Sequence, residues 1–222
     1  MLKKKLKDPL FFISLITFAF WLADAYLKIF ILKAPQRMLW YSATGLGLTT
    51  IALMTRNSFL ITSMFCALVI NESIWTISFI SNFFLKADIV QVADYAFKAS
   101  YSKFKFIVTS YHLFLVPALV AGLLVTKKIH RLGWLGAYFF ASIVAVLAYI
   151  LPDPFGENIN CVRSEGVRMT ESCKLYFSSF YNGFNDFPMI FIVTAILAYF
   201  VYLPINYLLL FLGKRMKQWG IQ

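Results

Sequence analysis

The sequence predicts an all-α, polytopic membrane protein, with six transmembrane helices forming a single domain over residues 1–222. Hydrophobic residues make up 60% of the chain and charged residues 14%, whereas soluble domains have about 45–50% and about 25%. Six apolar runs are long enough to cross a bilayer, and basic residues gather at their ends. This composition excludes an ordinary soluble domain, a disordered chain and a small disulfide-stapled protein.

Each predicted span follows from length and hydropathy. A spanning helix needs roughly 20 mostly apolar residues, because the hydrocarbon layer is about 30 Å thick and a helix rises about 1.5 Å per residue. Because the apolar runs are continuous rather than alternating, they favour helices over a β-barrel. The runs that qualify are 10–32, 38–54, 58–79, 106–126, 132–151 and 187–211.

The distribution of Lys and Arg predicts the orientation. Three basic clusters lie before the first span, between the fourth and fifth, and after the sixth: Lys3, Lys4, Lys5 and Lys7; Lys127, Lys128 and Arg131; Lys214, Arg215 and Lys217. An even number of spans puts all three on one side, which the positive-inside rule makes the cytoplasm. Both termini are therefore expected there. The net charge of +11 then indicates anionic membrane lipids, and no nucleic acid, as partners.

The first span begins after basic residues, as a signal peptide does, but its apolar run is long and no small-residue cleavage site ends it cleanly. An uncleaved signal anchor is expected. The protein is therefore predicted to be multi-pass in a bacterial cytoplasmic membrane or a membrane of the eukaryotic secretory pathway.

Two long loops are predicted on the outer side. Within 86–105, polar positions recur at three- and four-residue steps opposite apolar ones, which predicts an amphipathic interfacial helix that is either a lid or a connector. The loop over 152–186 carries Cys161 and Cys173. An oxidising compartment would permit a disulfide between them, and two free thiols are the alternative. Cys66, inside the third span, is expected to serve packing.

Polar residues inside the spans are the candidates for function, since an ionisable side chain in hydrocarbon costs at least about 2.5–3.5 kcal/mol. Asp24, Thr44, Glu72 and His112 each lie six to eight residues from the outer end of their span. At about 1.5 Å per residue this is a depth of roughly 9–12 Å. Thr194 falls near the same layer, and Asn71 precedes Glu72. The sequence predicts one polar site in the outer leaflet.

Structural alternatives remain open for these residues, and His112 alone could be a satisfied structural histidine. Asp24 and Lys28 have the i, i+4 spacing of a helix ion pair, so Asp24 is also explained locally. Glu72 has no basic residue within one turn, so it must be neutral or pair across helices, with His112 as a candidate. Thr44, near Gly45 and Gly47, also suits close helix packing.

The residue types suggest acyl-transfer chemistry. A threonine hydroxyl becomes a nucleophile when a base takes its proton, and histidine is the usual base near neutral pH. Thr44 and His112 are the candidate catalytic pair, with Asp24, Asn71, Glu72 and Thr194 as the supporting polar layer. The sequence has no second histidine suited to a metal cluster, no HExxH, no Gly-rich phosphate loop and no CxxC motif, so no metal and no cofactor are expected.

Two short motifs carry a resemblance. Trp40-Tyr-Ser-Ala-Thr44 opens the second span, and His112-Leu-Phe-Leu-Val-Pro117 lies in the fourth. They resemble the paired signatures of the androgen-induced membrane hydrolase family, six-helix threonine hydrolases that cleave fatty-acid esters of hydroxy fatty acids. The resemblance implies Thr44 as nucleophile and His112 as base. Asn71-Glu72 and the loop holding Cys161 and Cys173 depart from the family pattern.

Three functions follow as hypotheses. The first is an intramembrane lipid hydrolase or acyltransferase acting on a lipid-like substrate. The second is a proton-coupled small-molecule carrier using Glu72 and Asp24, although the chain shows no internal repeat and the polar layer is off-centre. The third is a non-catalytic subunit of a membrane-protein partner, or a lipid-binding scaffold.

Overall fold

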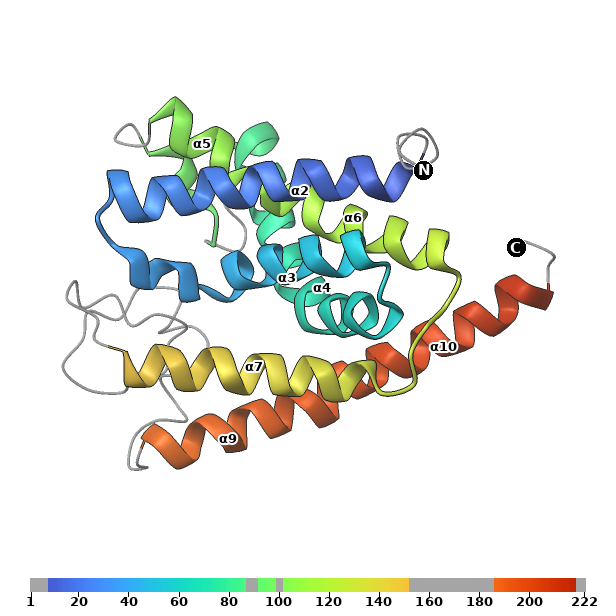
Figure 1. Ribbon diagram of the computed structural model, residues 1–222. Helices are drawn as coiled ribbons and strands as arrows, with labels where there is room; N and C mark the ends of the chain where they lie inside the picture. Colours follow the sequence, from blue (N-terminus) through green and yellow to red (C-terminus); the bar gives the residue numbers. More distant parts are fainter. Residues whose placement is uncertain (1–7, 87–91, 99–101, 152–185, 219–222) are drawn as a thin grey trace.

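The computed structural model describes residues 8–86, 92–98, 102–151 and 186–218, and these residues form helices and no strand (Figure 1). Short π- and 3-10 helices interrupt or join the α-helices. The α-helices are α2 (Pro9–Tyr26), α3 (Tyr41–Thr55), α4 (Ser58–Ile80), α5 (Lys103–Thr109), α6 (Tyr111–Thr126), α7 (Gly133–Ile150), α9 (Asp186–Leu197) and α10 (Leu203–Gln218).

The predicted spans correspond to these helices. Among the described residues, five helical stretches are long and apolar enough to cross a membrane: Pro9–Ile31, Ser58–Leu85, Lys103–Thr126, Gly133–Ile150 and Pro188–Met216. The sixth, α3, has 15 residues and is shorter than predicted, because a 3-10 helix over Pro35–Leu39 precedes it. The chain therefore has the architecture of an integral, multi-pass membrane protein.

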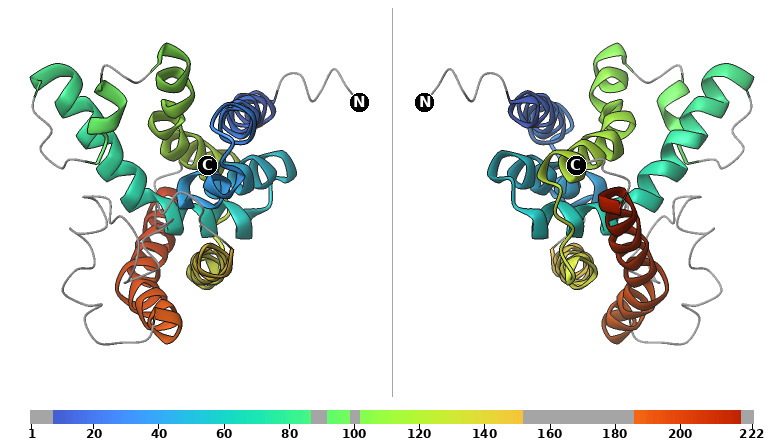
Figure 2. Two further views of the ribbon diagram at one scale, coloured as in Figure 1. Left: turned by 90° about the vertical axis from the view of Figure 1, so that its left-hand side faces the viewer. Right: turned by 90° about the vertical axis from the view of Figure 1, so that its right-hand side faces the viewer.

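Both ends of the described chain, the start of α2 and the end of α10, lie at the same end of the bundle, which we call the terminal end (Figure 1). Helix α4 is central and packs against α3, α6 and α7, while α2 packs against α3 and α6. Figure 2 views the bundle nearly along α2 and α7, and α4 passes obliquely between them. Residues on α4 are therefore placed to meet residues of several helices.

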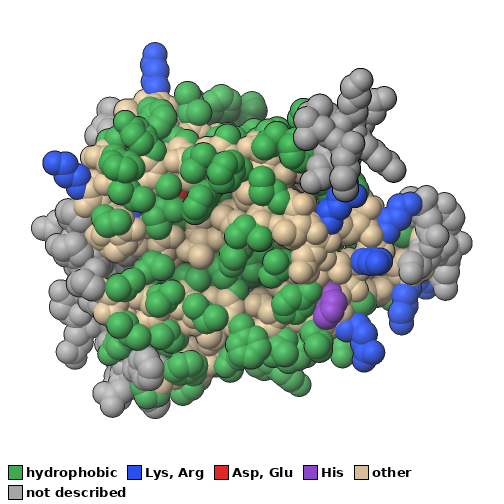
Figure 3. All heavy atoms as spheres, in the orientation of Figure 1, with side chains coloured by type: hydrophobic (Ala, Val, Ile, Leu, Met, Phe, Trp, Pro, Cys, Tyr) green, Lys and Arg blue, Asp and Glu red, His purple; other side chains and the backbone are tan. Residues whose placement is uncertain are grey.

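Small residues allow this close packing. A Cβ atom added to Gly45 would lie 2.7 Å from Leu68, and one added to Gly47 would lie 2.7 Å from the Trp21 ring. These glycines let α3 approach α4 and α2, as small residues do in membrane helix pairs. Outside this core the surface is a belt of large apolar side chains, and basic side chains gather at the terminal end (Figure 3).

The terminal end of α3 and α4 is fixed by local polar contacts. Arg56 adopts a left-handed conformation (φ 53°) that ends α3, and its guanidinium pairs with Asp8, the N-cap of α2. The Asn57 side chain then accepts hydrogen bonds from the first backbone N–H groups of α4. These contacts satisfy donors that a helix start leaves unpaired.

Two predictions about the loops are tested only in part. In the loop over 86–105 the described residues 92–98 contain a four-residue 3-10 helix, Asp94–Phe97. Ala93 is buried, and the Ser78 hydroxyl on α4 accepts hydrogen bonds from the N–H groups of Val92 and Ala93 at 3.2 and 2.9 Å. This part of the loop therefore packs onto α4 instead of forming an amphipathic α-helix. Cys161 and Cys173 lie outside the described residues.

Candidate functional site

A short, buried polar contact joins α4 to α6. His112 Nδ1 lies 2.6 Å from Glu72 Oε2, and the two side chains are 9% and 2% exposed. Glu72 projects from the middle of α4, and His112 lies at the start of α6, just after the break at Ser110 that separates α5 from α6. The predicted cross-helix partner of Glu72 is therefore present in the structure.

Aromatic rings enclose the His112 imidazole. The Trp75 ring lies 4.4 Å from it at an interplanar angle of 22°, and the Tyr111 ring lies 4.2 Å away at 24°. Trp75 is itself held by a 3.1 Å hydrogen bond from Nε1 to the Tyr95 hydroxyl. Because the rings restrict the imidazole plane and Glu72 holds one of its nitrogens, the orientation of His112 is fixed.

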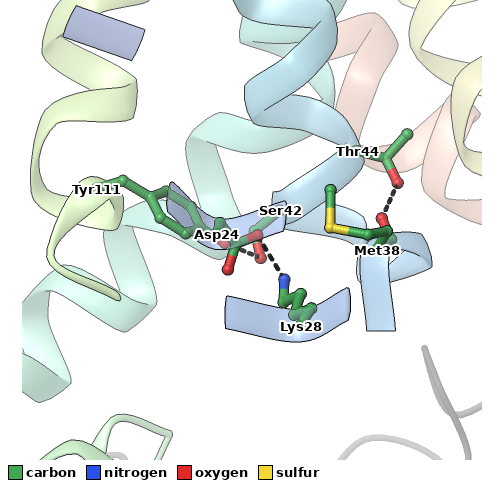
Figure 4. Close-up of polar contacts among 6 residues, drawn as sticks. All are labelled: Asp24, Lys28, Met38, Ser42, Thr44 and Tyr111. Carbon is green, nitrogen blue, oxygen red and sulfur yellow. Dashed lines mark hydrogen bonds and ion pairs between the residues drawn. The ribbon is translucent and has the colours of Figure 1, made fainter. Parts of the chain in front are cut away.

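A second acid–base pair joins α2 to the π-helix over Leu27–Ile31 that continues it. Lys28 Nζ is 2.6 Å from Asp24 Oδ2, with side chains 11% and 5% exposed. Nearby, the Tyr111 hydroxyl donates a hydrogen bond to Ser42 Oγ at 3.2 Å. Figure 4 shows Asp24, Ser42 and the tip of Tyr111 converging from three helices. Asp24 therefore has the local partner that its sequence spacing suggests, and it also faces the interior of the bundle.

Tyrosines connect the two acid–base pairs. The Tyr111 ring stacks on His112, the partner of Glu72, and the Tyr111 hydroxyl donates to Ser42 Oγ beside Asp24. Next to Ser42 in the chain, the Tyr41 hydroxyl lies 3.0 Å from that of Tyr202. One polar cluster therefore extends from α2 through α3, α4 and α6 to the π-helix over Ala198–Tyr202.

Thr44 is held away from this cluster. Its hydroxyl donates to the Met38 carbonyl at 2.8 Å, and Figure 4 shows it pointing to the opposite side of α3 from Asp24 and Tyr111. Within the described part of the chain, Thr44 has no hydrogen bond to His112. The structure therefore places the two predicted catalytic residues in separate contacts.

The remaining members of the predicted polar layer also lie apart. Asn71 is exposed on the surface of α4. Thr194 donates to the Ile190 carbonyl at 2.8 Å and accepts from Ser142 Oγ at 3.2 Å, which joins α9 to α7. Among the predicted residues, the cluster contains Asp24, Glu72 and His112.

Sequence reasoning missed Tyr111, Trp75, Ser42 and Tyr41 as parts of the site. Trp75 follows Glu72 by three residues, a spacing that places both on one helix face, so this signal was available. The tyrosines were counted as apolar residues of their spans, and their hydroxyl contacts depend on helix rotation that hydropathy does not report.

The arrangement of Glu72 and His112 is chemically suited to proton transfer. A carboxylate that accepts from Nδ1–H leaves the imidazole Nε2 as a proton acceptor, the arrangement that orients a histidine base. His112 Nε2 carries no hydrogen bond to any of the described residues. The described His, Cys, Asp and Glu side chains form no group of three that could hold a metal ion.

A comparison with protein-family models, curated proteins and solved structures finds no match to this chain.

Proposed function

We propose that this protein is an intramembrane lipid hydrolase or acyltransferase in which the Glu72–His112 pair is the proton acceptor. The observation that supports it is the 2.6 Å contact between two buried ionisable groups. Retaining such groups in a membrane domain is costly, and their order, carboxylate then imidazole, is that of an oriented general base. The resemblance of the Trp40–Thr44 and His112–Pro117 motifs to membrane threonine hydrolases supports the same chemistry.

Thr44 is the proposed nucleophile. Its oxygen would attack the ester carbonyl of a lipid, its proton would pass to His112 Nε2, and the departing alcohol would take that proton. This step requires the hydroxyl to leave the Met38 carbonyl and reach the imidazole. Transfer of the acyl group to water gives hydrolysis, and transfer to a second alcohol gives acyl exchange.

A proton-coupled carrier is the second candidate. It is favoured by one specific observation: Tyr111 lies between two acid–base pairs, since its ring stacks on His112 of the Glu72–His112 pair and its tip points toward Asp24 of the Asp24–Lys28 pair. Such a series of protonatable groups suits a proton path. Catalysis is preferred because the chain shows no internal repeat of the kind many carriers have.

The test is ester turnover by the purified, full-length protein in detergent, with a panel of fatty-acid esters including fatty-acid esters of hydroxy fatty acids. Loss of a general base costs typically 10²–10⁴-fold in rate, so His112→Ala should lose at least about 100-fold. Thr44→Ala should lose activity equally, and Glu72→Gln should lower the rate while preserving fold.

Asn71→Ala is the matched control, because it changes the exposed neighbour of Glu72 and should leave the rate unchanged. Activity that survives Thr44→Ala but not His112→Ala would exclude Thr44 as the nucleophile and indicate that water attacks the ester directly. If no ester is turned over and Glu72→Gln abolishes proton-coupled uptake, the hydrolase proposal is contradicted and the carrier proposal is supported.

A further inference from the structure

An apolar groove of about 590 Å³, including its open side, lies between α3, α4 and α7. Its lining includes Leu39 and Thr44 at the end remote from the termini and Leu60 near the terminal end, with Leu48, Met64 and Val144 between them. On α7 the lining extends from Gly136 to Leu147, about 16 Å at the rise of an α-helix. The groove therefore runs along more than half of a hydrocarbon layer.

The chemistry of the groove selects its occupant. Its two polar side chains, Thr44 and Ser63, each donate to a backbone carbonyl, at 2.8 Å to Met38 and 2.7 Å to Phe59. No lining side chain therefore requires a polar ligand, and apolar walls at this depth in a membrane favour hydrocarbon. A water-soluble substrate is disfavoured here.

The two ends of the groove differ. At the terminal end α4 and α7 are in tight contact, since a Cβ added to Gly136 would overlap Ser63 and lie 2.8 Å from the Phe59 ring. At the other end Leu39 is the last residue of the 3-10 helix over Pro35–Leu39, which also carries Gln36 and Arg37. Thr44 donates to the Met38 carbonyl of the same helix. A chain would therefore enter tail first and keep its polar end beside Thr44.

A route also connects the groove to the polar cluster. Phe140, which lines the groove, packs against the Tyr41 ring with centroids 4.7 Å apart. Tyr41 is followed by Ser42, which accepts a hydrogen bond from the Tyr111 hydroxyl, and the Tyr111 ring stacks on His112. The groove is therefore linked to the polar cluster through these side chains.

We propose that this groove binds a single lipid acyl chain, with its carboxyl end at Thr44 and its methyl end near Leu60 and Gly136. The proposal rests on the proposed function and deepens it by placing the acyl chain of the lipid substrate, with its ester at the outer end of the groove. The chain binds whether or not turnover follows, so binding is measured separately from activity.

The test uses the full-length protein reconstituted in phosphatidylcholine vesicles that contain a palmitoyl lipid with a diazirine at one of two places. With the diazirine at the methyl end, photolabelling should concentrate on the peptides of Leu60, Met64 and Gly136. With the diazirine near the carboxyl end, it should concentrate on 39–48. Equal labelling of these positions and of lipid-facing residues such as Phe139 and Phe200 would show annular lipid only and overturn the proposal.

A groove-filling variant completes the test. Leu60→Trp should reduce labelling by the methyl-end probe at Met64 and Gly136 several-fold. Ile51→Trp, on the exposed face of α3, should leave it unchanged. If Leu60→Trp does not fold, Leu48→Trp provides the same measurement. His112→Ala should keep full labelling, so failure of the groove and failure of the hydrolase are distinguishable. Unchanged labelling in a folded groove-filling variant would contradict the proposal.

Discussion

The imidazole of His112 and the carboxyl group of Glu72 meet at 2.6 Å although they are 40 residues apart in the sequence. Their contact joins α4, the central helix, to α6 just beyond the break at Ser110. Because both side chains are almost fully buried, each offsets part of the cost of burying the other. The pair is therefore a structural link between two helices as well as the proposed base.

Breaking this link should destabilise the protein. Leaving a buried hydrogen-bonding group without its partner costs about 1–3 kcal/mol, and more when that group is charged. We therefore expect Glu72→Ala and His112→Ala each to lower the thermal unfolding temperature in detergent markedly. Asn71→Ala should change stability by less than about 0.5 kcal/mol, as exposed substitutions do.

A double-mutant cycle isolates the interaction itself. Residues in direct contact show coupling energies of about 0.5–3 kcal/mol, so the Glu72→Ala/His112→Ala variant should be less destabilised than the sum of the single variants. Strictly additive losses would show that the two residues act independently.

The Asp24–Lys28 pair should behave similarly within one helix. Lys28→Met leaves the Asp24 carboxyl buried without its cation, and we expect a loss of about 3 kcal/mol. Replacing both members with Asp24→Leu/Lys28→Met removes the uncompensated charge and should recover most of that loss. The measurement is thermal unfolding of the single and double variants in one detergent. A double variant less stable than Lys28→Met would show that the Asp24 carboxyl makes a stabilising interaction with a residue other than Lys28.

The sequence predicts the spans well because the thickness of a bilayer sets their length. It also places Glu72 and His112 at one depth, since depth follows from position along a span. It does not predict which way each helix faces. Thr44 and His112 share the same predicted layer, yet rotation about the helix axes directs them into different contacts.

The beginning of α3 shows why the remaining details escape prediction. Hydropathy begins this span at Met38, whereas the helix begins at Tyr41, after the 3-10 helix that starts at Pro35. The Met38 carbonyl therefore lies outside the helix and can accept the Thr44 hydroxyl. Apolar residues around a helix start do not reveal such a local hydrogen bond.

Packing at the terminal end predicts different costs for two glycine substitutions. A Cβ at Gly133 would lie 2.4 Å from Thr62 Cγ2 and 2.6 Å from Asn206 Oδ1. Gly133→Ala would therefore disturb the hydrogen bond from Asn206 Nδ2 to the Arg131 carbonyl. We expect a loss of about 1–3 kcal/mol, as for other overpacked sites, measured by thermal unfolding.

Gly213→Ala is the matched control, because its Cβ would meet only the movable end of the Ile129 side chain, at 2.7 Å. This substitution should be close to neutral. Equal stability losses in the two variants would show that the cost of Gly133→Ala does not come from overlap with Thr62 and Asn206.

The basic side chains at the terminal end predict that this end faces the cytoplasm. In a background where Cys66, Cys161 and Cys173 are replaced by serine or alanine, single cysteines at the exposed positions Lys128, Lys214 and Lys98 report the topology. A membrane-impermeant maleimide added to intact cells should label Lys98→Cys and leave the other two unlabelled until the membrane is opened.

Lys98 lies in the loop after α4, at the end of the bundle opposite the termini, so its labelling must differ from that of Lys128 if the chain crosses the bilayer as the helices indicate. If Lys128→Cys and Lys214→Cys are labelled in intact cells and Lys98→Cys is protected, the orientation is the opposite of the predicted one. The Glu72–His112 pair would then lie in the cytoplasmic leaflet.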